Sequence, residues 1–421
     1  MRRWCHTLRN EEFEVMSKTV TPKHTWTFAP RFRAGAFGWR SEPAITRIKE
    51  AVSEIKAISK KDQILGAEGA ILFLQKLSPA LQNIDGSSGA IGTAANRAIE
   101  ALVSIIAKAP VDLSLRRKWL EKLYQAHADD QVPYIESLAD YWGELCASSE
   151  IAAEWADRLA GTVETVFRRS KEEFGYFHGT PMAFSALLAS GQHERLLALI
   201  DLYPRKFWSY RKWGVDALVA LGRKADAILY AEECRGLNAP SWQIAQACEV
   251  ILLSSGMADE AYERYAYEAN QAGTYLATFR AICKKYPERT PESILADLVD
   301  RTHGEEGKWF AAAKDAKLYD LALDLARKSP VDHRTLLRAV EDFADSQPGF
   351  ALNAGLTALH WICAGRAYEA AMGEVRAIFD GVMKASEISG CQDSALNAIK
   401  KTLSGFPDER LVRGTLTNLL G

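Results

Sequence analysis

The chain has 421 residues, of which 48% are hydrophobic and 25% are charged, and its formal net charge is −2. These values are typical of a protein that buries a sizeable core, and they exclude a molecule that binds polyanions with its whole surface. No apolar run approaches the roughly 20 residues that a membrane helix needs, so the sequence predicts no membrane partner.

The residue types that carry most enzyme chemistry are dispersed. The seven cysteines and eight histidines form no C-x-x-C or H-x-x-x-H pair, which favours neither a disulfide framework nor a metal site and indicates a reducing cytoplasm. The sequence also lacks the phosphate-binding and nucleophile motifs of known enzymes. We therefore expect no catalytic residues, metal or cofactor. Enzyme activity stays uncertain, and an enzyme with an unrecognised site is only the third alternative for function.

Residues 1–41 form a basic, aromatic arm that does not follow a helical period. Met16 is a natural start, which leaves open whether residues 1–15 are an unstructured extension. A strand pattern is confined to the segment "TWTFAPRF", where Trp26, Phe28 and Phe32 could share one face. The candidate binding residues of the arm are aromatic or basic: Trp26, Phe28, Arg31, Phe32, Arg33, Phe37, Trp39 and Arg40.

The five aromatic side chains of the arm need a cover, because leaving each in water would cost about 1.5–3 kcal/mol. Residues 16–61 contain ten basic and three acidic residues, whereas residues 129–160 contain one basic and eight acidic residues. This asymmetry favours an arm that lies on its own helices. The alternative is an arm covered by a partner, either protein or nucleic acid, and the sequence leaves both open.

Residues 42–176 are predicted to be an N-terminal helical domain. In "EPAITRIKEAVSEIKAI" the apolar residues Ile45, Ile48, Val52 and Ile55 recur at steps of three and four, as on one face of a helix. The next segment, "DQILGAEGAILFLQKL", is apolar on nearly all sides and predicts a central helix. A domain boundary is expected near "EEFGYFHGTP" (172–181), where glycine, proline and aromatic residues interrupt the pattern.

Residues 177–421 contain a faint internal repeat. Segments that begin at Gly191, Gly222 and Gly256 align with spacings of 31 and 34 residues. An acidic residue followed by alanine recurs at the same offset, as Asp226–Ala227 and Glu260–Ala261. Fainter echoes begin at Ala316 and Gly365, with Asp320 and Glu369 at the acidic position.

Over roughly residues 180–385 this pattern resembles the second helix of tetratricopeptide-type repeats, with "WGVDALVALGRKADAILYAEE" as the best match. In such repeats glycine permits close helix crossing and alanine fills the contact. The resemblance implies an α-solenoid, a stack of helix pairs with a concave groove that binds peptides or proteins. It implies no catalytic residues.

A second basic and aromatic cluster lies in "YPRKFWSYRKW" (203–213). If residues 205–213 are helical, then Arg205, Trp208, Arg211 and Lys212 share one side of the helix, and we expect them on the wall of the groove as partner-binding residues. Aromatic stacking with cationic contact also suits single-stranded nucleic acid. The ordinary alternative is a helix with an aromatic core side and a solvated charged side.

The sequence thus predicts an all-α, cytoplasmic protein with an N-terminal arm, a helical domain and a helical-repeat domain. We expect a protein- or peptide-binding scaffold or adaptor. The alternative is a nucleic-acid-associated factor that uses the two basic, aromatic clusters. The oligomeric state is left open.

Overall fold

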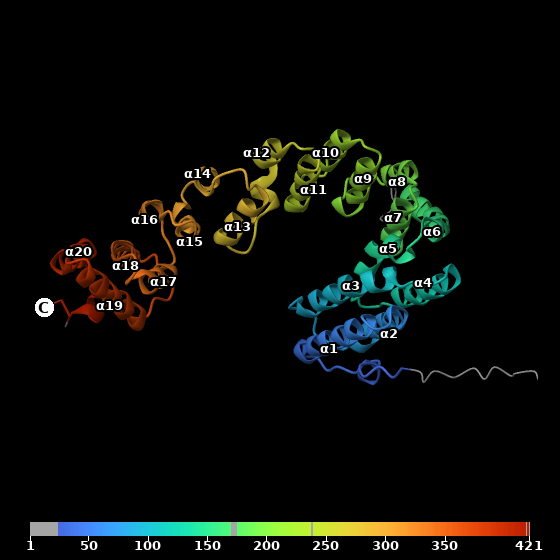
Figure 1. Ribbon diagram of the computed structural model, residues 1–421, viewed down its shortest axis with the longest axis horizontal. Helices are drawn as coiled ribbons and strands as arrows, with labels where there is room; N and C mark the ends of the chain where they lie inside the picture. Colours follow the sequence, from blue (N-terminus) through green and yellow to red (C-terminus); the bar gives the residue numbers. More distant parts are fainter. Residues whose placement is uncertain (1–23, 170–174, 237–238, 418, 421) are drawn as a thin grey trace, which may run out of the picture. The chain divides into compact units, whose positions relative to one another are not determined.

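The computed structural model describes residues 24–169, 175–236, 239–417 and 419–420, and within these ranges every regular element is a helix (Figure 1). This confirms the predicted all-α class. The chain divides into two compact units, one ending at Arg205 and one starting at Lys206.

The first unit contains eight α-helices and two 3-10 turns among its described residues: η1 (Ala29–Arg31), α1 (Ser41–Ser59), α2 (Gln63–Leu81), α3 (Ala90–Lys108), α4 (Leu113–Ala128), η2 (Glu136–Tyr141), α5 (Trp142–Cys146), α6 (Ser149–Arg169), α7 (Thr180–Ala189) and α8 (His193–Asp201). Helices α1, α2 and α3 pack against one another, and α5 joins α3 and α4 to α6 and α7. Helix α2 is buried on most of its surface, which explains why its sequence is apolar nearly all round.

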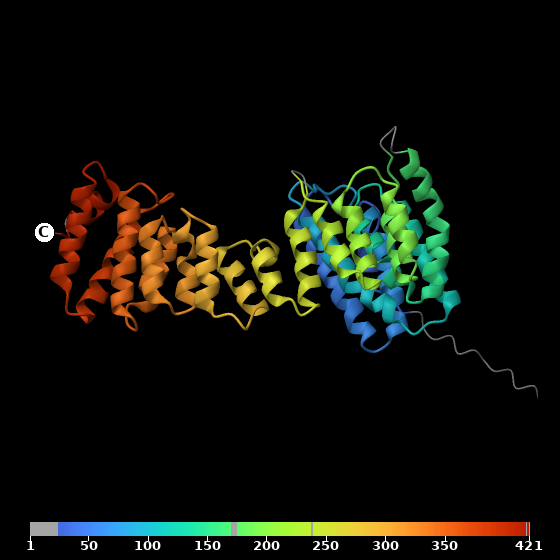
Figure 2. The same cartoon turned by 90° about the horizontal axis from the view of Figure 1, so that it is seen from above.

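The second unit contains the remaining described helices: α9 (Trp208–Ala220), α10 (Lys224–Glu232), α11 (Ser241–Leu253), α12 (Ala258–Ala269), α13 (Tyr275–Lys285), α14 (Pro291–Arg301), η3 (Glu306–Trp309), α15 (Phe310–Asp315), α16 (Tyr319–Lys328), α17 (His333–Phe343), α18 (Pro348–Cys363), α19 (Met372–Ile388), α20 (Gln392–Gly405) and α21 (Leu411–Leu416). From α13 to α20 they stand side by side in chain order (Figures 1 and 2). Between α9 and α16, the odd-numbered helices form one layer and the even-numbered helices form the other (Figure 1).

Helices α7 and α8 belong to the first unit because α7 packs against α5 and α6. The units therefore divide at Arg205, some 25 residues after the sequence segment 172–181 where the boundary was expected. Part of that segment, residues 172–174, lies outside the described residues.

Helices α2 and α3 are long and apolar enough, by length and composition, to cross a membrane. Each has 19 residues, and their mean hydropathies are 1.2 and 1.3. Core helices of globular units pass the same test, and both helices pack inside the first unit, so the feature is weak evidence. The absence of a membrane partner stays a prediction.

The described part of the arm lies on α1 and α2. Trp26, Phe28 and Phe32 are buried, and the rings of Phe28 and Phe32 each pack edge-on against Phe73 of α2. The backbone amide of Thr27 donates to Glu54 of α1 at 2.8 Å. The segment "TWTFAPRF" forms no strand: Ala29–Arg31 make the 3-10 turn η1 and the other residues are irregular. Its proline has no N–H to donate to a neighbouring strand.

The other arm residues remain near or on the surface. Phe37 is half-buried against Phe32, and Arg31 pairs with Glu50 of α1 at 3.0 Å. Arg33 and Arg40 are exposed, and Trp39 is 67% exposed. The aromatic residues of the arm thus split, with the first three in the core and the last at the surface.

The internal repeat corresponds to a recurring turn between helices. Gly191, Gly222 and Gly256 follow α7, α9 and α11, and each has a positive φ, between 73° and 75°. At Gly222 the two bonds of a Schellman turn close it, from Gly222 N to Val219 O (3.0 Å) and from Arg223 N to Leu218 O (2.8 Å). A Cβ on any of these glycines would meet nothing within 4 Å. Their role is therefore the left-handed turn, and the expected role in close helix crossing is wrong.

The echo at Ala316 is displaced by one residue. Lys317 holds the left-handed position, with φ 62°, and makes the same two turn bonds. Counting from it, the fifth residue is Ala322, which is fully buried like Ala227 and Ala261 at the same offset in their units. The Gly191 unit has the larger Leu196 at this offset, also fully buried, so the position is a core position whether the residue is small or large. At Gly365 the turn is present, but the next helix begins only at Met372.

Candidate functional site

The four partner-binding residues predicted in 205–213 do not form one exposed patch. Helix α9 begins at Trp208, so Arg205 precedes it and is exposed. Trp208 is only 8% exposed and belongs to the core. The side chain of Lys212 lies over the ring of Trp213, with its Nζ 5.1 Å from the ring centroid.

Arg211 is held within the second unit rather than presented outward. Its side chain is 11% exposed and pairs with Glu233 of the α10 C-terminus at 2.7 Å. The guanidinium lies 3.9 Å from the ring centroid of Tyr230, and Glu233 also accepts from Lys206 at 2.8 Å. These contacts tie α9 to α10, so the cluster acts mainly in packing, and the expected wall of exposed residues is not formed by Trp208 and Arg211.

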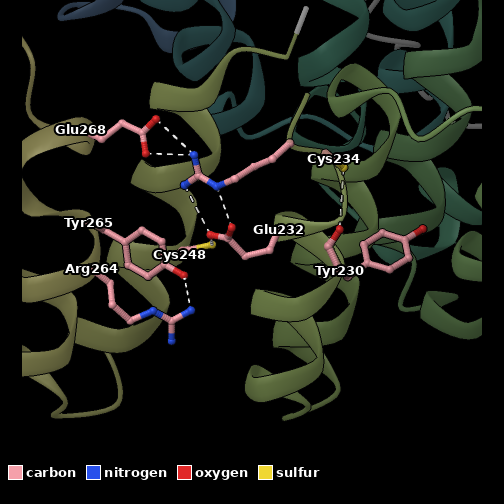
Figure 3. Close-up of polar contacts among 8 residues, drawn as sticks. Tyr230, Glu232, Cys234, Cys248, Arg264, Tyr265 and Glu268 are labelled. Atoms are coloured by element: carbon pink, nitrogen blue, oxygen red, sulfur yellow. Dashed lines mark hydrogen bonds and ion pairs between the residues drawn. The ribbon is translucent and has the colours of Figure 1, made fainter. Parts of the chain in front are cut away.

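A polar cluster joins α10, α11 and α12 (Figure 3). Arg235 donates to Glu232 at 2.6 Å and to Glu268 at 2.9 Å, and it bridges the carboxylates of two successive helix pairs. The thiol of Cys248 on α11 lies 3.8 Å from Glu232. Burial tends to raise the pKa of Glu232, but hydrogen bonds from Arg235 and Tyr265 outweigh it and lower the pKa.

This cluster stabilises the packing of three helices, and none of its groups is activated for catalysis. Burial first, and then the charge of Glu232, raise the pKa of the Cys248 thiol to about 11, so the group is a neutral thiol at neutral pH. Burial likewise raises the pKa of Tyr265, whose hydroxyl accepts from Arg264 at 2.7 Å. No group in the cluster is poised as a nucleophile or base, and its bonds fix three helices relative to one another.

A second stabilising network is centred on Glu249, which is completely buried on α11. Its carboxylate accepts from Asn270, Lys285 and Tyr286, each at 2.7 Å. A buried carboxylate requires this degree of pairing because an uncompensated charge in the interior costs several kcal/mol. The network holds α11 against α13. Sequence analysis missed it, although a single glutamate inside the apolar run "SWQIAQACEVILL" was a visible signal.

Helix α11, which both networks contact, exposes two apolar side chains to solvent on one side. Trp242 is 50% exposed and Val250 is 55% exposed. With Gln246 between them they recur at four-residue steps and lie on one side of the helix. The buried residues Ile244 and Cys248 lie on the opposite side of α11, and the Cys248 thiol faces Glu232 of α10. The α11 stripe, defined by Trp242, Gln246 and Val250, therefore lies on the face of the odd-numbered helices.

Neither a search for metal-binding clusters among the described residues nor comparison with known proteins identifies another site. Within the described ranges no three His, Cys, Asp or Glu side chains converge as a metal site would require. Comparison with the models of known protein families finds no match, and comparison with curated proteins finds none. The resemblance to tetratricopeptide repeats therefore stays a prediction from the sequence.

Proposed function

We propose that the protein is a protein- or peptide-binding scaffold of the helical-repeat type, and that the α11 stripe is its recognition surface. The observation that carries the proposal is the pair of exposed apolar side chains, Trp242 and Val250, on one side of a helix whose other side is core. Single exposed apolar residues are common, but here an aromatic and a branched side chain stand two turns apart on the same side of one helix, as two separate apolar anchor points.

The architecture supports this surface. Helix pairs joined by the recurring Schellman turn, spaced by 31 and 34 residues at Gly191, Gly222 and Gly256, are the arrangement from which α-solenoids are built. In such stacks the first helix of each pair lines the groove, and α11 is a first helix. The Glu249 and Arg235 networks hold α11 on both sides, so the stripe is preorganised and binding costs little ordering entropy.

The chemistry of the stripe indicates its ligand. Trp242 and Val250 offer apolar contact, and Gln246 between them offers an amide donor and acceptor. This set suits a peptide with two apolar anchors and a free backbone group. A cytoplasmic location fits the six described cysteines, all of which are free thiols.

A site-specific crosslinker tests the proposal. A benzophenone amino acid placed at position 242 should capture a discrete partner from the native host, whereas the same group at Leu229 on α10 should not. Leu229 is 66% exposed but lies on the even-numbered layer, which makes it the matched control.

The captured partner then allows a direct measurement by calorimetry. Trp242→Ala should weaken its binding by about 2 kcal/mol or more, because buried aromatic anchors dominate interface energies. Leu229→Ala should leave binding unchanged. Equal capture from both positions, or full affinity in Trp242→Ala, would show that the stripe is only an exposed helix side.

The nucleic-acid alternative depends on Trp39, which is 67% exposed and carries Arg40 5.6 Å from its ring centroid. One stacking platform with one cation is a small basis for such binding. Binding of a single-stranded oligonucleotide that falls steeply with salt and is lost in Trp39→Ala would favour it.

A further inference from the structure

A groove in the first unit, distinct from the α11 stripe, runs between α1 and α3. It has a volume of about 490 Å³ and an apolar floor made by Ile45, Ile48 and Val52 of α1 and by Ala94 and Ala98 of α3. The α3 side is low because its alanine side chains end at Cβ. From Ile45 to Lys56 the α1 wall covers eleven steps, or about 17 Å at 1.5 Å per residue, which is three helical turns.

The rim of the groove is basic. Lys49 and Lys56 of α1 and Arg97 of α3 line it, and no carboxylate does. All three side chains are exposed, and none forms an ion pair with a carboxylate of the described ranges. The other side of α1 differs, since Arg31 and Arg47 there both bind Glu50, at 3.0 and 2.6 Å. The groove thus combines three cations that have no carboxylate partner among the described residues with an apolar floor that is accessible to a ligand.

We infer that the α1–α3 groove binds an acidic amphipathic helix of another protein. An apolar row at steps of three and four residues fits the floor, and glutamates or aspartates on both flanks reach the rim cations. Charge complementarity selects the acidic partner, because a basic helix would meet three like charges. The concave form selects a helix over a lipid surface, since membrane-bound surfaces insert convex apolar faces.

A designed peptide of about 18 residues serves as the probe, with leucines along one helical face and glutamates on both flanks, labelled with fluorescein. The full chain should bind it saturably in fluorescence anisotropy. A peptide of the same composition, scrambled so that the leucines share no face, should not bind. The triple variant Lys49→Glu, Lys56→Glu, Arg97→Glu should bind at least about tenfold more weakly.

A charge swap separates a specific rim from a damaged fold. The triple variant should gain affinity for the same peptide with lysine in place of glutamate, which an unfolded groove cannot do. The control variant Lys108→Glu, Lys118→Glu, Lys122→Glu carries the same charge change on exposed residues outside the groove. It should bind the acidic peptide as the wild-type chain does. Equal weakening in both triple variants, or no binding that exceeds the scrambled peptide, overturns the inference.

Three further outcomes would assign another occupant and overturn the partner helix. Binding of phosphatidylserine vesicles that depends on Lys49 and Lys56 would assign a membrane. A several-fold gain in peptide affinity on deletion of residues 1–23 would assign this chain's own N-terminus. A dimer in sedimentation that the groove variant alone converts to a monomer would assign a second copy. None of these depends on Trp242, so the proposed function stands or falls separately.

Discussion

The docking of the arm on α2 gives a prediction in which one substitution changes sign with its background. Trp26 is 6% exposed and lies against Gly69, in the middle of α2. A Cβ on Gly69 would stand less than 3 Å from three atoms of the Trp26 ring. Gly69→Ala therefore displaces the ring in the wild-type chain. In a Trp26→Ala chain the same methyl group enters vacated space.

The magnitudes follow from packing and from helix propensity. Overpacking a filled core costs about 1–3 kcal/mol, so Gly69→Ala should destabilise the wild-type chain by that amount. In the Trp26→Ala background the clash is gone, and replacing glycine by alanine in a helix should stabilise by about 1 kcal/mol. The double-mutant cycle should therefore give a coupling energy of about 2–4 kcal/mol. Trp26→Ala alone should cost about 3–5 kcal/mol.

Native-state hydrogen exchange, read by mass spectrometry on peptides from α2 and from α6, measures the local opening free energy of each variant. Gly161→Ala on α6 is the matched control, because a Cβ there meets nothing within 4 Å. It should stabilise α6 by about 1 kcal/mol in both backgrounds. If Gly69→Ala changes the opening free energy of α2 equally with and without Trp26, then the Trp26 ring does not pack against Gly69. In that case the arm is not a structural part of the unit.

Two other outcomes are expected. Lys317→Gly should raise the free energy of unfolding by about 1 kcal/mol, because a φ of 62° strains a residue that has a Cβ. The converse change, Gly222→Ala, should lower the free energy of unfolding by a similar amount. A loss of stability in Lys317→Gly would contradict this reasoning. Burial, and next the neighbouring His178, lower the pKa of His127 from 6.5 to about 4, so the folded state favours the neutral imidazole. The resulting contribution to stability is complete above pH 6.5. It falls by about 3 kcal/mol as the pH is lowered toward 4. Denaturant titrations of wild-type and His127→Gln chains across this range should converge toward low pH, and parallel curves would refute the assignment.

The all-α class was predictable because helical periodicity is a local property of the chain. Ile48 and Ile55 of α1 are buried as their spacing predicts. The central position of α2 followed from its apolar composition. The repeat was found through Gly191, Gly222 and Gly256, although the reason for these glycines is the left-handed turn, which a sequence alignment does not reveal.

The candidate site was less predictable because burial depends on contacts between helix pairs. Trp208 and Trp242 both lie in the first turn of a helix, yet the first is 8% exposed and the second 50% exposed. The basic residues around Trp208 suggested an exposed position, and the apolar residues around Trp242 suggested a buried one, which is the opposite of what the structure shows. Arg211 looked like a binding residue because its partner, Glu233, lies 22 residues away and is brought to it only by the turn at Gly222.

The way the second unit is stabilised bears directly on how it would bind. Polar bridges connect its helices. Arg211 with Glu233 joins α9 to the end of α10, whereas Arg235 with Glu268 and Lys285 with Glu249 reach from one helix pair to the next. Such bridges depend on geometry, so they fix the angle between neighbouring helices more tightly than apolar contact alone. The core layer can therefore be held in place while the opposite side of α11 is left apolar and open. A surface that is rigid before it meets its ligand loses little entropy on binding, and this supports the proposal that a stripe as short as Trp242 to Val250 is an anchor site.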